Sequence, residues 1–310
     1  MTVFNTLKSQ KSDNLSSVRL PDIPLINKAF SPEIKSELIN LKAKINDIVQ
    51  PEIQEFFNLA FLGILESVSN TRKRGGFLSV EPRDVPPGRV ETLFYNRIES
   101  MLSNLSSNED GNKKSRVIVK AKQGDARNLL TKRKFDAIIT SPPYPNRHDY
   151  TRIYSLEMAF DYISNNQDLK LLRYKTLRSH VEAKKQFSTN KYIKPEIVNE
   201  LLNKIESNGT NNPRILSMLD GYFEDMFLVF SEMNKCLKEN GQIGIIVSNV
   251  RFAGINVPVD EILSTICSQT GLVSKEIWAA RYRGNSSQQM GKYKRVPSRE
   301  SILIIEKTER

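Results

Sequence analysis

The chain has 310 residues, of which 39% are hydrophobic and 26% are charged. This composition is typical of a folded protein with a sizeable core, and the length fits about two domains or one enlarged α/β domain. No apolar run approaches the roughly 18 residues of a membrane span, and the first residues lack the apolar stretch of a signal peptide. Two cysteines and two histidines exclude a disulfide framework and a structural zinc site. We therefore expect a cytoplasmic protein without a membrane partner.

The positive charge of the chain is concentrated in two segments. Residues 170–194 hold eight Lys or Arg and one acidic residue, and residues 281–299 hold six Lys or Arg and no acidic residue. Together they exceed the whole net charge of +11, so the rest of the chain is slightly acidic. Concentrated positive charge is typical of a surface that binds a polyanion such as nucleic acid. The alternative is a pair of solvated basic loops.

The first 110 residues predict mostly helix. Ser31 before Pro32 is typical of a helix start. Apolar residues at spacings of three and four after Pro51 predict a helix with one buried face. The predicted segments are an extended arm at 1–30 and a helical region at 31–110, with helices within 31–70 and at 90–105 and a loop at 73–88.

Beyond residue 110, apolar strand-like runs alternate with helical patterns. The near-continuous apolar run at 243–248 is typical of a strand that a parallel sheet buries on both faces, and the short run at 135–140 is also expected to be a buried strand. The alternation predicts an open α/β sheet with an antiparallel hairpin of the last two strands at its edge. The predicted elements are strands at 116–122, 135–140, 243–248, 275–280 and 301–307, helices at 221–238 and 258–270, and a helix C-cap at Gly241.

The most specific motif is Ser141-Pro142-Pro143-Tyr144, which directly follows the predicted strand at 135–140. Ligands of open α/β sheets bind at the carboxyl ends of the strands, where this turn falls. Consecutive prolines stiffen the turn. The Ser141 hydroxyl and the backbone carbonyls can accept hydrogen bonds from an amino group, and Tyr144 can stack on a planar ring. The alternative is an ordinary strand-ending turn with a core tyrosine.

In this setting the chain resembles the DNA amino-methyltransferases, whose signature is Asp, Asn or Ser, then Pro-Pro and an aromatic residue, as in Ser141–Tyr144. The resemblance covers residues 116–307, including the two final strands. It implies a Rossmann-like α/β methyltransferase sheet that methylates an exocyclic amino group in double-stranded DNA, after the base has flipped out of the duplex. Gly124-Asp125-Ala126 looks like the acidic position that contacts the adenine ring of the cofactor, S-adenosyl-L-methionine. The implied cofactor-binding residues are Asp125, Ala126 and Ser141.

The resemblance also implies catalytic roles for the four residues of the turn. Ser141 and the Pro142 carbonyl would hold the amino hydrogens, Pro143 would stiffen the turn, and Tyr144 would stack on the base. Alignment would supply most of the acceleration, so small displacements should be costly. Serine at the first position favours N4 of cytosine over N6 of adenine. Methylation of carbon 5 needs a cysteine after a proline, and neither cysteine of the chain follows one.

The family's glycine-rich cofactor turn, Phe-x-Gly-x-Gly, has no match in the sequence. The nearest segment, Phe61-Leu62-Gly63, has one glycine and lies in a helical pattern. We therefore expect an incomplete methyltransferase sheet whose first strands are missing. Three explanations compete: a split enzyme whose second subunit supplies the turn in a heterodimer, a DNA-binding subunit that has lost catalysis, and an unrecognised cofactor site. The intact turn and Asp125 favour a split enzyme of a restriction–modification system over decay, and an RNA base methyltransferase is a further alternative.

Candidate DNA contacts come from the two basic segments of the predicted catalytic region, 111–310. Residues 165–212 are long for a plain connection and predict a recognition insertion, and the loop after residue 280 is rich in Arg, Asn and Gln, which can read base edges. The alternatives are a solvated helical excursion and an ordinary hairpin loop. His180 is expected to form a hydrogen bond or lie at the surface, and Asn249 is expected to line a pocket or cap a helix. The candidate contacts are Arg147, Lys170, Arg173, Arg178, Lys184, Lys185, Arg281, Tyr282, Arg283, Gln288 and Gln289.

Overall fold

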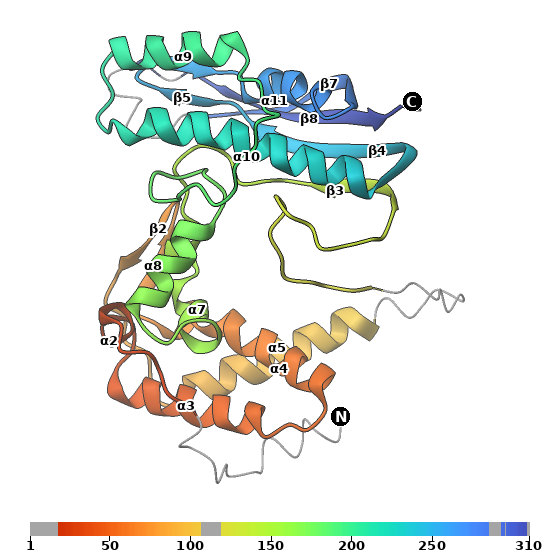
Figure 1. Ribbon diagram of the computed structural model, residues 1–310. Helices are drawn as coiled ribbons and strands as arrows, with labels where there is room; N and C mark the ends of the chain where they lie inside the picture. Colours follow the sequence, from red (N-terminus) through yellow and green to blue (C-terminus); the bar gives the residue numbers. More distant parts are fainter. Residues whose placement is uncertain (1–17, 107–118, 285–292, 295, 309–310) are drawn as a thin grey trace. The chain divides into compact units, whose positions relative to one another are not determined.

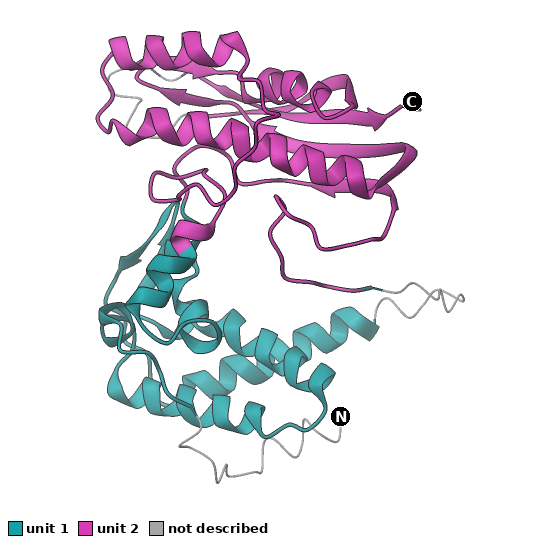
Figure 2. Ribbon diagram, viewed as in Figure 1, with its two compact units in different colours: residues 1–119, 149–172 teal, residues 120–148, 173–310 magenta. Residues whose placement is uncertain are grey.

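The computed structural model describes residues 18–106, 119–284, 293–294 and 296–308 (Figure 1). The chain forms two compact units, one of residues 1–119 with 149–172 and one of residues 120–148 with 173–310 (Figure 2). The first unit therefore takes residues 149–172 from within the predicted catalytic region. Among the described residues, no helix combines the length and the apolar character of a membrane span.

The first unit is built mainly of helices around one hydrophobic core. Phe61 and Phe94 are fully buried in this core. Ser31 caps α3, as predicted, because its side chain accepts a hydrogen bond from the Ile34 amide at 3.3 Å. The elements are α2 (Pro24–Ala29), α3 (Pro32–Asn46), α4 (Pro51–Ile64), the 3₁₀ turn η2 (Glu66–Val68), α5 (Arg89–Ser106), α6 (Tyr150–Ile153) and α7 (Ser155–Asp161).

Two predictions for this unit are wrong. The predicted loop after residue 73 contains most of an antiparallel hairpin, β1 (Thr71–Arg74) and β2 (Phe77–Val80), which turns at Gly75 with φ +54°. Within the predicted extended arm, α2 is helical because Ile26 and Ala29 are buried in the core of the unit. The predicted strand at 116–122 lies mostly outside the described residues, and residues 119–122 have no regular structure.

The second unit contains a mixed four-stranded sheet in the order β3-β4-β8-β7. β3 runs parallel to β4, whereas β8 is antiparallel to both β4 and β7. The predicted α/β class and the antiparallel final pair are confirmed. β8 lies between β4 and β7, so the last strand of the chain is internal to the sheet. The strands are β3 (Phe135–Thr140), β4 (Leu237–Ser248), β7 (Leu272–Arg283) and β8 (Ser298–Lys307).

Helices of the second unit share one hydrophobic core with the sheet. The long helix α10 (Figure 1) contributes side chains to this core, among them Tyr222 and Phe230, which are fully buried. Asn249 follows β4 and caps α11, because its side-chain oxygen accepts a hydrogen bond from the Asp260 amide at 3.2 Å. The remaining elements are α8 (Asn166–Lys175), which begins in the first unit, α9 (Glu196–Ser207), α10 (Arg214–Cys236), α11 (Val259–Ser268), and the hairpin β5 (Val250–Phe252) and β6 (Ile255–Val257).

Two expectations for the sheet need correction. Gly241 is no helix cap, because α10 ends at Cys236 and Gly241 lies inside β4, where a Cβ would come within 2.7 Å of the Leu237 side chain. β3 was predicted to be buried, yet Ile139 is 81% exposed and Phe135 is 40% exposed. The exposed side chains lie on the face of the strand opposite Ile138, which packs against the core of the unit, so the described residues cover only one face of β3. β3 also lies at the edge of the sheet, since it pairs only with β4 among the described strands.

Candidate active site

The motif Ser141–Tyr144 directly follows β3 and lies at the carboxyl end of that strand. β3 and β4 are parallel, so the ends of both strands meet at this edge of the sheet, which is where open α/β sheets bind ligands. The Ser141 side chain is exposed and Tyr144 is half-buried against the core of the second unit. The stiff turn therefore presents the Ser141 hydroxyl at the surface, and the Tyr144 ring packs against the core of the unit.

The Tyr144 hydroxyl belongs to a network of charged groups on β7 and β8. It donates a hydrogen bond to Glu300 Oε1 at 3.0 Å and lies 3.4 Å from Ser141 Oγ. Arg281 Nε contacts the other carboxylate oxygen of Glu300, and Arg283 lies 3.3 Å from Oε1. Arg281 and Glu300 are direct cross-strand partners, so the sheet register fixes this contact.

These contacts shift the pKa values of the two central groups in opposite directions. Burial raises the pKa of the Tyr144 phenol, and its hydrogen bond to the Glu300 carboxylate raises it further. Burial opposes ionisation of Glu300, but hydrogen bonds from Arg281 and Tyr144 and the nearby arginine charges hold the pKa of Glu300 below its ordinary value. At neutral pH the pair is therefore a neutral phenol that donates to an ionised carboxylate.

Asp125, the predicted cofactor contact, is held by a buried arginine. Arg127 donates from Nε and Nη2 to the two oxygens of the Asp125 carboxylate, at 2.9 Å and 2.7 Å. Arg127 Nη1 also donates to Asp225, a fully buried residue of α10, at 2.8 Å. Burial opposes ionisation of Asp125, but the Arg127 contacts lower its pKa, so the carboxylate stays charged.

The surroundings of Asp125 fit one end of S-adenosyl-L-methionine. The Asp125 side chain is 37% exposed, and a carboxylate oxygen can accept further hydrogen bonds, such as one from an adenine amino group. A Cβ built on Gly124 would meet no atom within 4 Å, so the space beside this backbone is open. Ala126 is exposed beside it. The described residues offer no glycine turn for the rest of the cofactor.

The predicted DNA contacts fall into three groups. Arg178 is buried, and its guanidinium pairs with Asp225 and Glu224, so this side chain is not available for the predicted DNA contact. Lys184 lies over the Tyr174 ring at 4.2 Å, and Lys185 pairs with Glu224 at 2.7 Å, although both lysines are exposed. The other described candidates, namely Arg147, Lys170, Arg173, Arg281, Tyr282 and Arg283, are exposed or half-buried, and Gln288 and Gln289 lie outside the described residues.

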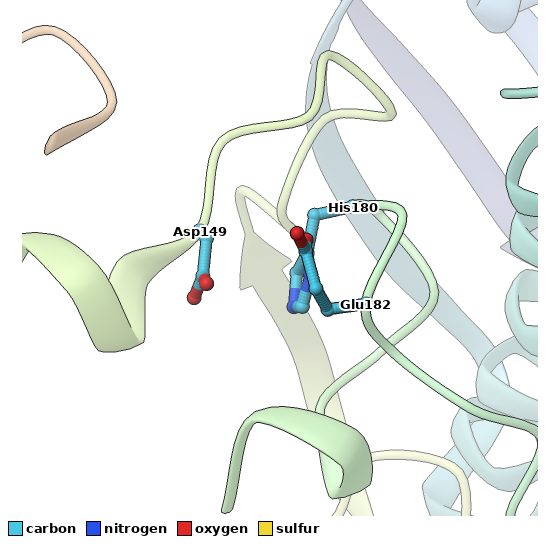
Figure 3. Close-up of side chains that lie close together, drawn as sticks. All are labelled: Asp149, His180 and Glu182. Carbon is cyan, nitrogen blue, oxygen red and sulfur yellow. The ribbon is translucent and has the colours of Figure 1, made fainter. Parts of the chain in front are cut away.

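His180 is a buried hydrogen-bonding residue, one of the two roles expected for it. Its Nε2 lies 2.8 Å from the Thr176 hydroxyl, and its Nδ1 lies 3.4 Å from Glu182. Figure 3 shows the side chains of His180 and Glu182 close together. Asp149, also drawn there, caps helix α6 by accepting a hydrogen bond from the Thr151 amide at 2.9 Å. Both side chains therefore have structural partners within their own segments.

Sequence reasoning missed Glu300, Arg127 and Asp225. Glu300 lies 156 residues after Tyr144, and no local pattern links the two. The one available signal was an acidic residue directly after the basic segment 281–299 and directly before the predicted apolar strand at 301–307. Arg127 follows Asp125 by two residues, a spacing that lets its side chain fold back onto the carboxylate.

Several known proteins that are similar to this chain are named as type II methyltransferases. The type II methyltransferase M.BsoBI of Geobacillus stearothermophilus is 31% identical over 306 aligned positions, which cover 83% of this chain and 60% of the relative. The type II methyltransferases M.AvaI of Nostoc sp. and of Anabaena variabilis are each 30% identical, covering 82% of this chain and 59% of theirs. The homologues of this chain are therefore type II methyltransferases.

The chain spans about 60% of the length of these curated relatives. The type II methyltransferase M.MvaI of Kocuria varians, at 22% identity, is covered to 58%. No protein-family profile and no solved structure matches the chain. These similarities cover about four fifths of this chain, and its own structure has a mixed sheet with helices.

Proposed function

We propose that this chain methylates the exocyclic amino group of a base in double-stranded DNA, with N4 of cytosine favoured over N6 of adenine. The observation that carries the proposal is the Ser141–Tyr144 turn at the carboxyl end of β3, in a chain homologous to type II methyltransferases. A type II methyltransferase is half of a restriction–modification system, which supports DNA as the substrate. Serine at the first position of the turn supports cytosine.

The residues of the turn would bind and align the target base. The Ser141 hydroxyl and the Pro142 carbonyl would accept the amino hydrogens, which would turn the nitrogen lone pair towards the methyl group of the cofactor. The Tyr144 ring would stack on a base that has left the duplex. Because the prolines restrict the turn, the acceptors are pre-organised and little entropy is lost on binding. S-adenosyl-L-methionine, when bound, supplies an electrophilic methyl group, and Asp125 with Ala126 would hold its adenine end.

A second polypeptide carrying the Phe-x-Gly-x-Gly turn would complete the cofactor site. The position of β3 supports this part of the proposal, because β3 pairs only with β4 among the described strands and exposes Ile139 and Phe135 on one face. Folded proteins normally cover or charge such an edge, since its backbone groups can pair with another strand. We propose that strands of the second subunit add to β3 in a heterodimer.

Methyl transfer to duplex DNA tests the proposal. Tritiated S-adenosyl-L-methionine is incubated with DNA and the chain, alone and with the protein encoded by the neighbouring gene. Transfer only in the mixture supports a shared site, and mass spectrometry of digested nucleosides distinguishes N4-methylcytosine from N6-methyladenine.

Tyr144→Ala provides the matched active-site variant. Loss of stacking and of the ring should lower transfer by at least about a hundredfold, because alignment supplies most of the acceleration. Tyr162→Ala, an exposed tyrosine of the first unit, is the control and should retain activity. DNA binding without any transfer, in the chain alone and in the mixture, would contradict the proposal and favour a non-catalytic DNA-binding subunit.

A further inference from the structure

Glu300 is a buried carboxylate beside the catalytic turn. It lies on β8, is 5% exposed, and accepts a hydrogen bond from the Tyr144 hydroxyl at 3.0 Å. Nothing in the Ser141–Tyr144 motif requires an acidic residue at this place.

A buried carboxylate is costly unless its oxygens are paired. Glu300 meets this condition with three partners, of which Tyr144 binds one oxygen, Arg281 contacts the other, and Arg283 lies 3.3 Å from the first. Both arginines come from β7, which pairs with β8 directly at Arg281 and Glu300, just after a register shift between Ala279 and Arg281. The arginines therefore keep Glu300 ionised and in one orientation.

We propose that Glu300 is a positioning residue that fixes the Tyr144 ring for stacking on the target base, an inference that rests on the proposed function. The rigid backbone before Tyr144 holds the ring at its Cβ, and Glu300 holds it at the opposite end through the hydroxyl. A ring fixed at both ends cannot swing about its side-chain torsions. Glu300 thus gives the stacking surface a defined plane before the base arrives.

The same carboxylate links the ring to the strand that carries predicted DNA contacts. Arg281 and Arg283 lie at the end of β7, and the predicted contacts Gln288 and Gln289 follow them in the sequence. Both arginine side chains are about half exposed, so one side of each remains open to solvent while the other contacts Glu300. A DNA phosphate bound to these arginines would therefore be linked to the Tyr144 hydroxyl through the Glu300 side chain.

Three variants separate positioning from simple stability. Glu300→Ala removes the acceptor, and we expect kcat for methyl transfer to fall about tenfold or more while KM for S-adenosyl-L-methionine stays within about twofold. Glu300→Gln keeps an oxygen that can accept from Tyr144, so it should recover most of kcat. Glu306→Ala is the control, because it is an acidic residue of the same strand whose partners are Gln242 and Lys275.

A double-mutant cycle shows whether Glu300 acts through the hydroxyl. Tyr144→Phe removes the donor and keeps the ring, so the double variant with Glu300→Ala should be no slower than the slower single variant. Additive losses would overturn the proposal, because they would show that Glu300 acts by another route. An equal fall in Glu300→Ala and Glu306→Ala would overturn it as well.

Titration of the phenol keeps this test separate from the proposed function. Ultraviolet difference titration of the protein against Tyr144→Phe isolates one of the ten tyrosines. Glu300→Gln should lower the pKa of Tyr144, since it removes a neighbouring negative charge. This shift is expected even in a chain that methylates nothing, so absent transfer with a normal shift would reject only the function. An unchanged titration would reject the Glu300 contact itself.

Discussion

Asp225 shows how single charged residues hold the second unit together. Its side chain is fully buried in α10 and accepts hydrogen bonds from both Arg127 and Arg178, at 2.6–3.0 Å. Arg127 then reaches Asp125, and Arg178 reaches Glu224. The buried Asp225 carboxylate therefore holds Arg127, which contacts Asp125, and also holds Arg178 of the basic segment 170–194.

Replacing Asp225 with Asn should destabilise this unit strongly. The substitution leaves two buried guanidinium groups without their shared charge, and breaking a buried ion pair typically costs about 3–5 kcal/mol. Urea unfolding followed by circular dichroism measures the loss. Glu200→Gln, which breaks the exposed pair with Lys204, is the control and should cost less than about 1 kcal/mol. Similar small losses in both variants would show that the buried network contributes little.

At the scale of elements, β3 has the apolar sequence of an interior strand but lies at the edge of the sheet. Its neighbour β4 has Ile243, Ile245 and Val247 buried in the core, whereas Ile139 of β3 is exposed on the face opposite Ile138. A lysine at such a position blocks strand addition without disturbing the existing ladder.

Ile139→Lys should therefore preserve the fold of the chain and abolish its assembly with the proposed second subunit. Because the side chain is 81% exposed, we expect the midpoint of thermal unfolding to change by no more than about 2 °C. Size-exclusion chromatography of the mixture and methyl transfer measure assembly. Ile193→Lys, at a residue that is 72% exposed elsewhere in the unit, is the control. Full activity of Ile139→Lys in the mixture would refute the edge as the contact.

The elements that sequence predicted well are those whose signals are local. The Ser31 cap, β3 and the turn after it each depend on neighbouring residues, and the structure contains all three. The burial of Arg178 depends on Asp225, which lies 47 residues away, so its charge alone suggested a surface contact. The exposure of Ile139 and Phe135 depends on what packs on their face of the sheet, and an apolar run looks the same whether one face or both faces are covered.

At the scale of the whole molecule, the basic charge would attract DNA before any base is read. Each phosphate that a protein neutralises releases counterions, which makes affinity fall with salt in proportion to the number of contacts. Lys170 and Lys191 are exposed residues of the first basic segment. Lys28 and Lys204 are equally exposed lysines outside both basic segments.

Changing Lys170 and Lys191 to Gln should weaken binding to duplex DNA and reduce the slope of log affinity against log salt by up to about two. The reason is that each lost phosphate contact removes about 0.9 from the slope. Fluorescence anisotropy of a labelled duplex at several salt concentrations measures both quantities. The pair Lys28→Gln and Lys204→Gln removes the same charge, so an equal change in both proteins would mean that net charge, rather than the basic segment, governs binding. A smaller slope for the first pair alone would assign the phosphate contacts to residues 170–194.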